Sequence, residues 1–268
     1  MKLSTGLSFL LTLALVSAAP YHSELDHLEK RSTSWPSAKK TISNNSPIVV
    51  KAGQTFDGFK KNNNQWVRYD RGRKGLGDCT KIEGGKNDAV FILEKGATLK
   101  NVILGANSIE HVHCIGDGCT VENVWWEDVC EDALTLRDSK NGNAKFYVKG
   151  GGAKNGSDKI IQHNSAGTVY ISNFIVQNSG KLYRACGNCK SGYQNKRKVV
   201  MTNVTATNVK VIAGINKNYG DQAVLKNVKV NNGHVCQTFK GNNNGKEPSS
   251  TGYQCESKNV NNCTYKIL

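Results

Sequence analysis

Two neighbouring stretches decide the fold: "GATLKNVILGA" at residues 96–106 and "GCTVENVWWEDV" at residues 118–129. Each is a short run rich in β-branched residues that follows a glycine and carries an asparagine near its middle. The pattern returns in "AGTVYISNFIVQN" from Ala166, "RKVVMTNVTATNV" from Arg197 and "QAVLKNVKVNN" from Gln222. The chain therefore contains an internal repeat that an asparagine marks in each copy.

The repeated asparagines are 22, 50, 30 and 24 residues apart: Asn101, Asn123, Asn173, Asn203 and Asn227. The interval of 50 accommodates one further copy, "NAKFYVKGG" from Asn143, which lacks the asparagine. Strands of about five residues at this spacing, with Gly and Asn turns and no helical period, are typical of a solenoid of parallel strands. We therefore predict an all-β fold, a right-handed parallel β-helix. Val and Ile should fill its interior, and stacked asparagines can hydrogen-bond from turn to turn.

An antiparallel β-sandwich is the competing interpretation, because short strands at regular spacing also serve that architecture. Asn-Gly pairs, a strong hairpin signal, begin at residues 141, 155 and 232. None of them falls between consecutive strand pairs, so the sequence favours the solenoid.

The N-terminal region is predicted to be removed. Residues 8–18, "SFLLTLALVSA", form an apolar segment too short to span a bilayer, which predicts a secretory signal peptide over residues 1–19. A polar stretch over residues 20–31 ends in Lys30-Arg31 and predicts a propeptide; a plain linker is the alternative. Residues 32–268 then form one β-helix domain, which we expect to be extracellular and monomeric.

Nine cysteines in an exported chain predict disulfides, and their odd number leaves at least one thiol without an internal partner. Cys186-Gly-Asn-Cys189 has the spacing of a zinc-finger pair, but export favours a disulfide across this tight loop. Four Asn-X-Ser/Thr sequons fit a glycosylated extracellular protein: Asn44, Asn155, Asn203 and Asn262.

The formal net charge is +15, and residues 1–31 add nothing to it because their charges cancel. A strongly basic surface recruits polyanions, which for an exported chain means acidic polysaccharides or anionic surfaces; plain solvated lysines are the alternative. The sequence shows neither an aromatic-and-basic motif nor an amphipathic helix, which argues against nucleic-acid and membrane partners.

Negative charge concentrates in "WWEDVCEDALTLR", residues 125–137, which hold Glu127, Asp128, Glu131 and Asp132. These acids can be ordinary surface charges that neutralise lysines. Beside two tryptophans, however, the cluster would be costly without a cation, and hard cations such as Ca²⁺ prefer carboxylate oxygens. Because strand side chains alternate, Glu127 and Asp128 should not both face one site, nor should Glu131 and Asp132. The preceding coil can add Glu110 from "IEHVHC".

Several blocks, in their order and spacing, resemble the family 3 pectate lyases: "FILEKGATLKNVILGA", "VHC", "WEDVCEDALTL", "DKIIQHNSAGTVYISNF" and "GKLYRACGNC". The likeness covers roughly residues 79–190 and weakens toward the C-terminus. It implies a small right-handed parallel β-helix, secretion, and calcium-dependent eliminative cleavage of polygalacturonate or low-ester pectin.

The resemblance also implies calcium ligands at Glu110, Asp128 and Asp132, with Glu131 close by. Where the family often has "DGVHC", this chain has "EHVHC". The longer Glu110 can still ligate, but the change alters the geometry of the site.

The resemblance carries the catalytic cations of the family onto Lys159 in "DKIIQ" and onto Lys181 and Arg184 in "GKLYR". β-Elimination removes the proton on C5 of a uronate, which cations must acidify by neutralising the adjacent carboxylate. Lys159 is the preferred base, because crowding by calcium and other cations can drive a lysine neutral, whereas arginine hardly loses its proton. Arg184 is the alternative base and suits bidentate binding of a carboxylate. Lys181 and Arg137 are assigned to substrate binding.

Two rival functions remain. A non-catalytic module for acidic glycans would use the same basic face and the same calcium, and only formation of an unsaturated uronide separates it from a lyase. A hydrolase on the same fold would need paired aspartates as acid and base, whereas here the aspartates lie in the metal-like cluster; chelator sensitivity decides. His111 and His113 could suggest zinc, but no third nitrogen ligand matches them.

Overall fold

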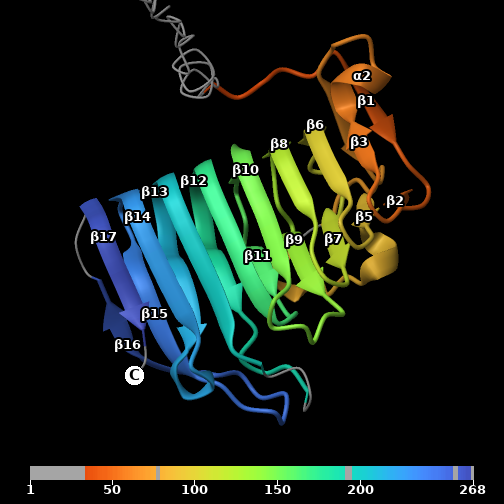
Figure 1. Cartoon of the computed structure of the whole chain (residues 1–268). Coiled ribbons are helices and arrows are strands. Elements are labelled where there is room, and N and C mark those ends of the chain that lie inside the picture. Colours follow the sequence, from red (N-terminus) through yellow and green to blue (C-terminus); the bar gives the residue numbers. More distant parts are fainter. Residues whose placement is uncertain (1–33, 77–78, 191–194, 256–258, 267–268) are drawn as a thin grey trace, which may run out of the picture. The chain divides into compact units, whose positions relative to one another are not determined.

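The computed structural model describes residues 34–76, 79–190, 195–255 and 259–266, which form a parallel β-helix (Figure 1). Strands of successive coils lie side by side and pair in parallel, so the solenoid prediction is confirmed and the antiparallel sandwich is not observed among these residues. Within the same residues, no helix has the length and apolar character needed to cross a membrane. The predicted boundaries at residues 19 and 31 lie outside the described residues.

One sheet carries the asparagine-marked repeats. In spatial order it contains β3 (Thr55–Asp57), β6 (Thr98–Leu104), β8 (Thr120–Trp126), β10 (Lys145–Lys154), β12 (Gly167–Ala185), β13 (Arg197–Asn216) and β14 (Gln222–Asn231). The repeats expected on successive coils therefore stack in the predicted order. Beside this sheet, β1 (Lys40–Ser43) pairs with β4 (Val67–Asp70), which joins the end of β6.

A second sheet is formed by other parts of the same coils. It begins with β2 (Ile48–Val50), β5 (Phe91–Leu93), β7 (Val112–Ile115), β9 (Asp132–Arg137) and β11 (Lys159–His163). The long strands β12 and β13 continue round the bend and add their C-terminal parts, followed by β15 (His234–Lys240). The second sheet carries the functional cleft described below.

The two ends of the β-helix differ from its middle. At the C-terminal end, β16 (Ser249–Gln254) and β17 (Asn259–Lys266) pair antiparallel with β15 and β14, which covers strand edges that would otherwise be open. Near the other end, the Asp57 carboxylate caps the short helix α2 (Gly58–Lys61) by accepting from backbone N–H groups. Three 3₁₀ turns lie in loops: η1 (Cys79–Lys81), η2 (Lys86–Asp88) and η3 (Lys217–Tyr219).

Each repeated asparagine makes a bend inside its strand, with parallel pairing to the neighbouring coil before and after it. All five have left-handed backbones, with φ between 50° and 55°. Where they occupy neighbouring coils, the amide of one donates to the side-chain oxygen of the one before at 2.8–3.0 Å, as the sequence predicted. In the coil without the asparagine, Gly150 lies opposite Asn123 and adopts φ 66°, a conformation that glycine reaches without steric cost.

A second asparagine ladder marks another bend, which the sequence analysis did not identify. It joins Asn178, Asn208 and Asn232, whose φ angles are 49–64° and whose amide-to-oxygen distances are 3.2–3.3 Å. The interior confirms the expected stacking of like residues. Val102 lies opposite Val124, and Val204 lies opposite Val228, all of them buried.

Three disulfides join cysteines of the described residues. Cys186 pairs with Cys189, which confirms the disulfide predicted for the tight loop. The others are Cys114–Cys119, across the connection from β7 to β8, and Cys79–Cys130.

Candidate active site

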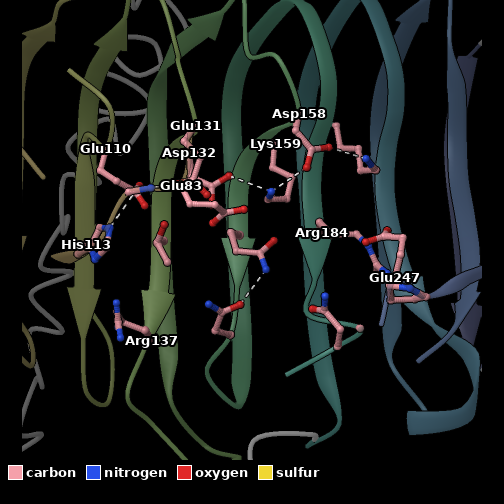
Figure 2. Close-up of a pocket in the computed structure, with 18 residues that line it drawn as sticks. Glu83, Glu110, His113, Glu131, Asp132, Arg137, Asp158, Lys159, Arg184 and Glu247 are labelled. Atoms are coloured by element: carbon pink, nitrogen blue, oxygen red, sulfur yellow. Dashed lines mark hydrogen bonds and ion pairs between the residues drawn. The ribbon is translucent and has the colours of Figure 1, made fainter. Parts of the chain in front are cut away.

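A cleft of about 370 Å³ lies over the second sheet (Figure 2). Its charged side chains come from β9, β11 and β12, from the loops before β7, β9 and β11, from the loop after η1, and from the loop between β15 and β16. Parallel register fixes their order, because Asp132 lies opposite Lys159 and Lys159 lies opposite Lys181. Residues that are more than 20 positions apart in the chain thus form one row along the helix axis.

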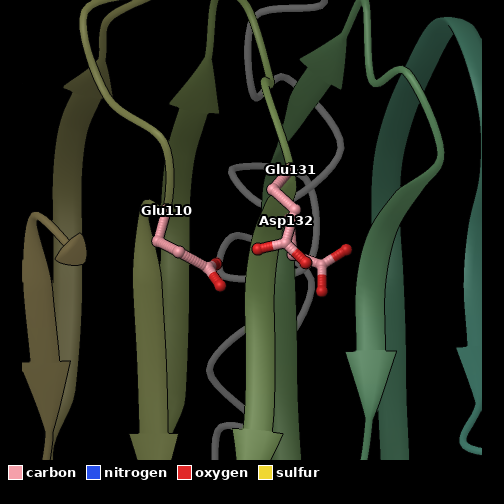
Figure 3. Close-up of side chains that lie close together, drawn as sticks. All are labelled: Glu110, Glu131 and Asp132. Atoms are coloured by element: carbon pink, nitrogen blue, oxygen red, sulfur yellow. The ribbon is translucent and has the colours of Figure 1, made fainter. Parts of the chain in front are cut away.

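Three carboxylates meet at one end of the cleft (Figure 3). Glu110 precedes β7, Glu131 precedes β9, and Asp132 is the first residue of β9; one oxygen of each lies within 4.8 Å of the others. The expectation that strand alternation keeps Glu131 away from Asp132 is wrong. Glu131 lies in the bend before the strand, where alternation does not apply.

The segment that carries Glu131 is held by a covalent bond and a hydrogen bond. The disulfide Cys79–Cys130 ties the residue before Glu131 to the loop at η1. From the same loop, the Gly84 N–H donates to Glu131 Oε2 at 3.3 Å. These contacts position the Glu131 carboxylate over the cleft although it belongs to no strand.

The three carboxylates are short of compensating charge. Burial raises the pKa of Glu110 to about 7, and burial together with Glu110 raises the pKa of Glu131 to about 8. The pKa of Asp132 is also raised to about 8, because burial outweighs the opposing effect of Lys159. Glu110 Oε2 and Asp132 Oδ1 are buried without a hydrogen-bond partner among the described residues. Buried carboxylates with unused oxygens are the donor set that suits a hard cation such as Ca²⁺.

The other two acids of the same stretch lie elsewhere. Glu127 forms a bidentate pair with Arg68, accepting from Nε at 2.5 Å and from Nη2 at 2.9 Å. Asp128 is exposed and does not line the cleft. The assignment of Asp128 as a calcium ligand stays a prediction, whereas the geometry brings together the three predicted ligands Glu110, Glu131 and Asp132.

The two buried histidines near the cluster do not form a zinc site with it. His111 directs its ring nitrogens at the backbone oxygens of Gly105 and Asp132, at 3.2 and 3.4 Å. His113 Nε2 lies 3.3 Å from Glu110 Oε2, and burial lowers the pKa of His113 to about 4, so its ring is neutral near pH 7. Among the described residues, the three carboxylates are the one group of three or more potential ligands whose atoms all lie within 4.8 Å of one another, and neither histidine belongs to it.

Lys159 adjoins the acid cluster and is linked to Lys181 through Asp158 (Figure 2). Lys159 Nζ lies 3.6 Å from Asp132 Oδ1 and 2.7 Å from Asp158 Oδ2. The other Asp158 oxygen accepts from Lys181 Nζ at 2.7 Å. Burial alone would raise the pKa of Asp158, but the two lysines outweigh it and lower that pKa to about 2. Asp158 is therefore a fixed negative charge between two cations.

The expectation that calcium and other cations crowd Lys159 concerns the calcium-bound site; the charged groups that the chain itself places nearest are carboxylates. These carboxylates, Asp132 and Asp158, outweigh burial and hold the pKa of Lys159 above its ordinary value. In the cleft as it stands, Lys159 is protonated. It can accept a proton only when these carboxylates are neutralised by other partners.

The two arginines lie at different depths. Arg184 is 5% exposed, and its guanidinium carbon lies 3.9 Å from the centre of the Phe239 ring. Its Nη1 donates to the carbonyl of Ala185 and to the side chain of Asn216. Burial lowers the pKa of Arg184 to about 10. Arg137 ends β9 and is half-buried at the cleft wall.

Two parts of the cleft were missed by the sequence analysis. Thr135 and Gln162 lie opposite one another on β9 and β11, and Thr135 Oγ1 and Gln162 Oε1 are buried without a hydrogen-bond partner among the described residues. Strand register relative to Asp132 and Lys159 could have identified both. Glu247 also lines the cleft, from the loop between β15 and β16, and no repeat or motif marks it.

Comparisons with known proteins point to one family. The pectate lyase family model matches residues 32–246. Pectate lyase E of Emericella nidulans is 51% identical over 245 residues, which cover 89% of this chain and 90% of that protein. The solved catalytic domain of pectate lyase PelI from Erwinia chrysanthemi is similar with a TM-score of 0.61 and 29% identity, covering 83% of this chain and 93% of that one. PelI in complex with tetragalacturonic acid gives a TM-score of 0.58 and 29% identity, covering 82% of this chain and 66% of that one.

Proposed function

The chain belongs to the pectate lyase family, and we propose that it cleaves (1→4)-α-D-galacturonan by calcium-dependent β-elimination, releasing 4,5-unsaturated oligogalacturonides from plant cell-wall pectin. The observation that carries the proposal is the row of charges in the cleft. An acid cluster suited to a cation lies beside Lys159, and Lys181 and Arg184 follow on the next strand, β12. Elimination from a uronate needs a bound cation and basic side chains together, because the uronate carboxylate must be neutralised while a base removes the C5 proton.

Glu110, Glu131 and Asp132 would hold the calcium ion. Their burial and unused oxygens suit a divalent cation. Their raised pKa values indicate that the chain supplies too little positive charge to them, so calcium would displace the protons that they hold near neutral pH. Bound there, calcium would supply Lewis-acid neutralisation of a substrate carboxylate. Asp128 is exposed and would require movement of the loop before β9 to join these ligands.

Lys159 is the proposed base. It is the amine nearest the acid cluster, and it lies on the strand row that the substrate follows. Once Asp132 serves as a metal ligand and Asp158 remains shared with Lys181, less negative charge acts on Lys159 and its pKa falls. The neutral amine can then take the C5 proton.

Arg184, Lys181 and Arg137 would bind carboxylates of the polymer. Arg184 has a planar fork held by Asn216 and the Phe239 ring, which pre-organises it for bidentate contact. Its depth in the cleft suits the sugar whose proton is removed. Lys181 lies on the same strand as Arg184, and Arg137 lies two strands away on β9, so both suit neighbouring sugars.

Extracellular action is supported by the disulfides among the described residues, since such bonds persist in oxidising compartments. The predicted signal peptide accords with it.

The test is activity on polygalacturonate before and after chelation. We expect the ultraviolet absorbance of unsaturated uronides to rise with the untreated enzyme, to stop after chelation, and to return with calcium. New reducing ends without that absorbance would instead indicate a hydrolase. Binding of the polymer without any cleavage would indicate a non-catalytic module, and either result would overturn the proposal.

A further inference from the structure

A second pocket of about 400 Å³ lies beyond the cleft on the same sheet. Residues of β12, β13, β15 and β16 line it, among them Lys181, Lys210, His234, Gln237 and Tyr253. Lys181 also lines the cleft, so the pocket and the cleft are neighbours that share this side chain. Neither the predicted ligands nor the predicted base lies in this pocket.

Strand register aligns the pocket with the charged row of the cleft. Each residue of that row lies opposite the next on the neighbouring strand: Asp132, Lys159, Lys181, Val211 and His234. A second row runs parallel to it, through Gln162, Arg184, Gly214, Gln237 and Tyr253. A polymer that follows the helix axis past Lys159 and Arg184 therefore reaches His234 and Tyr253 next.

Gly214 lies between Arg184 and Gln237 in the second row. A side chain there would begin 2.8 Å from Cδ of Arg184, whose guanidinium lies over the Phe239 ring. The glycine thus allows Arg184 its position.

The pocket offers an aromatic surface and a cation. Tyr253 is 44% exposed, and its ring stacks on His234 with centroids 3.8 Å apart and planes 15° from parallel. Stacking on His234 fixes the orientation of the partly exposed Tyr253 ring. An aromatic ring held in this way can pack on the apolar face of a sugar. Lys210 is exposed and forms no ion pair with a carboxylate of the described residues, so its ammonium is available to an anionic ligand.

We propose that this pocket is a distal subsite for a galacturonate residue of the same polymer chain that occupies the cleft. Tyr253 receives the sugar ring, and Lys210 binds its carboxylate. The inference rests on the proposed function, because the ligand is the same acidic glycan. It adds a preference for chains long enough to span from the acid cluster to β16.

A subsite this far from the reacting bond contributes to binding of long substrates more than to the chemical step. Aromatic stacking contributes about 0.5–1.5 kcal/mol, which corresponds to about two- to tenfold in affinity. Tyr253→Ala should therefore raise KM for hexagalacturonate about two- to tenfold more than KM for trigalacturonate. Lys210→Ala should act in the same direction, and more weakly at high salt.

Kinetics on the two oligosaccharides test the subsite, with thermal unfolding as the check on folding. Tyr253→Phe keeps the ring and should restore the chain-length preference. Lys226→Ala removes an exposed lysine of the first sheet and should match the wild type. If Tyr253→Ala and Lys210→Ala both keep the wild-type ratio of the two KM values, or lose trigalacturonate and hexagalacturonate cleavage equally, the proposal is wrong.

Calorimetric binding of hexagalacturonate in a Lys159→Ala background separates this inference from the lyase assignment. Weaker binding on adding Tyr253→Ala supports the subsite even if the wild type forms no unsaturated product. Unchanged binding overturns the subsite even if the wild type is an active lyase.

Discussion

The two sheets of this β-helix use the same coil-to-coil alignment with opposite results. On the first sheet, aligned asparagines donate and accept along a ladder at 2.8–3.0 Å. On the second, neighbouring coils bring together Glu110 and Asp132, and the bend before β9 adds Glu131; their pKa values are raised to about 7 or 8. An amide carries both a donor and an acceptor, so stacked copies satisfy one another, whereas ionised carboxylates only accept and repel. A repeat fold stabilises itself where its stacked groups are self-complementary, and is ready to bind a ligand where they are not.

The largest expected effect is the difference between two lysine variants, one on each sheet. Lys159→Ala should lower turnover of polygalacturonate by about 10²–10⁴-fold, the usual contribution of a positioned base. Lys149→Ala, on β10 of the first sheet, is the matched control and should keep wild-type turnover. A loss below about tenfold for Lys159→Ala, together with an inactive Arg184→Lys, would move the base to Arg184.

The acid cluster is tested by replacing carboxylates with their amides. Asp132→Asn should raise the calcium concentration needed for half-maximal activity by about tenfold or more, because it removes one charged ligand. Asp128→Asn tests the exposed acid of the same stretch. A higher calcium requirement in this variant would show that Asp128 becomes a ligand when calcium binds. Calcium titrations of activity give both values. Wild-type calcium dependence in Asp132→Asn would show that the cluster is not the metal site.

The cluster also predicts how the stability of the metal-free protein depends on pH. The folded carboxyls have pKa values raised to about 7 or 8, above the ordinary values of 3.8 and 4.5 that apply to the unfolded chain. Between these values the folded protein binds more protons than the unfolded chain, so its stability falls as pH rises. With a chelator present, we expect a lower melting temperature at pH 8 than at pH 5. Added calcium should raise the melting temperature more at pH 8 than at pH 5.

Two observations would contradict this account of the pH dependence. One is a metal-free melting temperature that rises from pH 5 to pH 8. The other is an Asp132→Asn variant with the same pH slope as the wild type, since removing one of the three titrating groups should flatten the slope.

The smallest effect is expected on the ladder of the first sheet. Asn123→Ala removes the hydrogen bonds to Asn101 and from Trp125, and places alanine at φ 54°. We expect a loss of about 1–3 kcal/mol in stability, seen as a lower melting temperature, with kcat unaffected. Asn123→Gly tolerates the backbone conformation and should lose less. If the two variants are equally stable, backbone strain contributes nothing and hydrogen bonding alone explains the ladder.

The sequence by itself determined the solenoid and most of the charged residues of its cleft. A strand repeat is local information, because each copy encodes its own β-branched run and its own bend, and similar copies stack on one another. The concentration of acids at residues 127–132 and the cations at Lys159, Lys181 and Arg184 were also readable, because each lies within or beside a short motif. Register then carries Asp132, Lys159 and Lys181 into one row.

Only the tertiary structure decided which acids face the cleft and what surrounds the cations. Glu131 joins Asp132 because a disulfide and the Gly84 N–H direct a residue that no strand periodicity constrains. Glu127 does not join the cluster because its carboxylate pairs with Arg68, which is 59 residues away in the chain. Carboxylates of two coils raise the pKa of Lys159, whereas the sequence analysis expected surrounding cations to lower it. Such long-range charge effects depend on distances across coils, and a linear pattern records only the residues and not their separation in space.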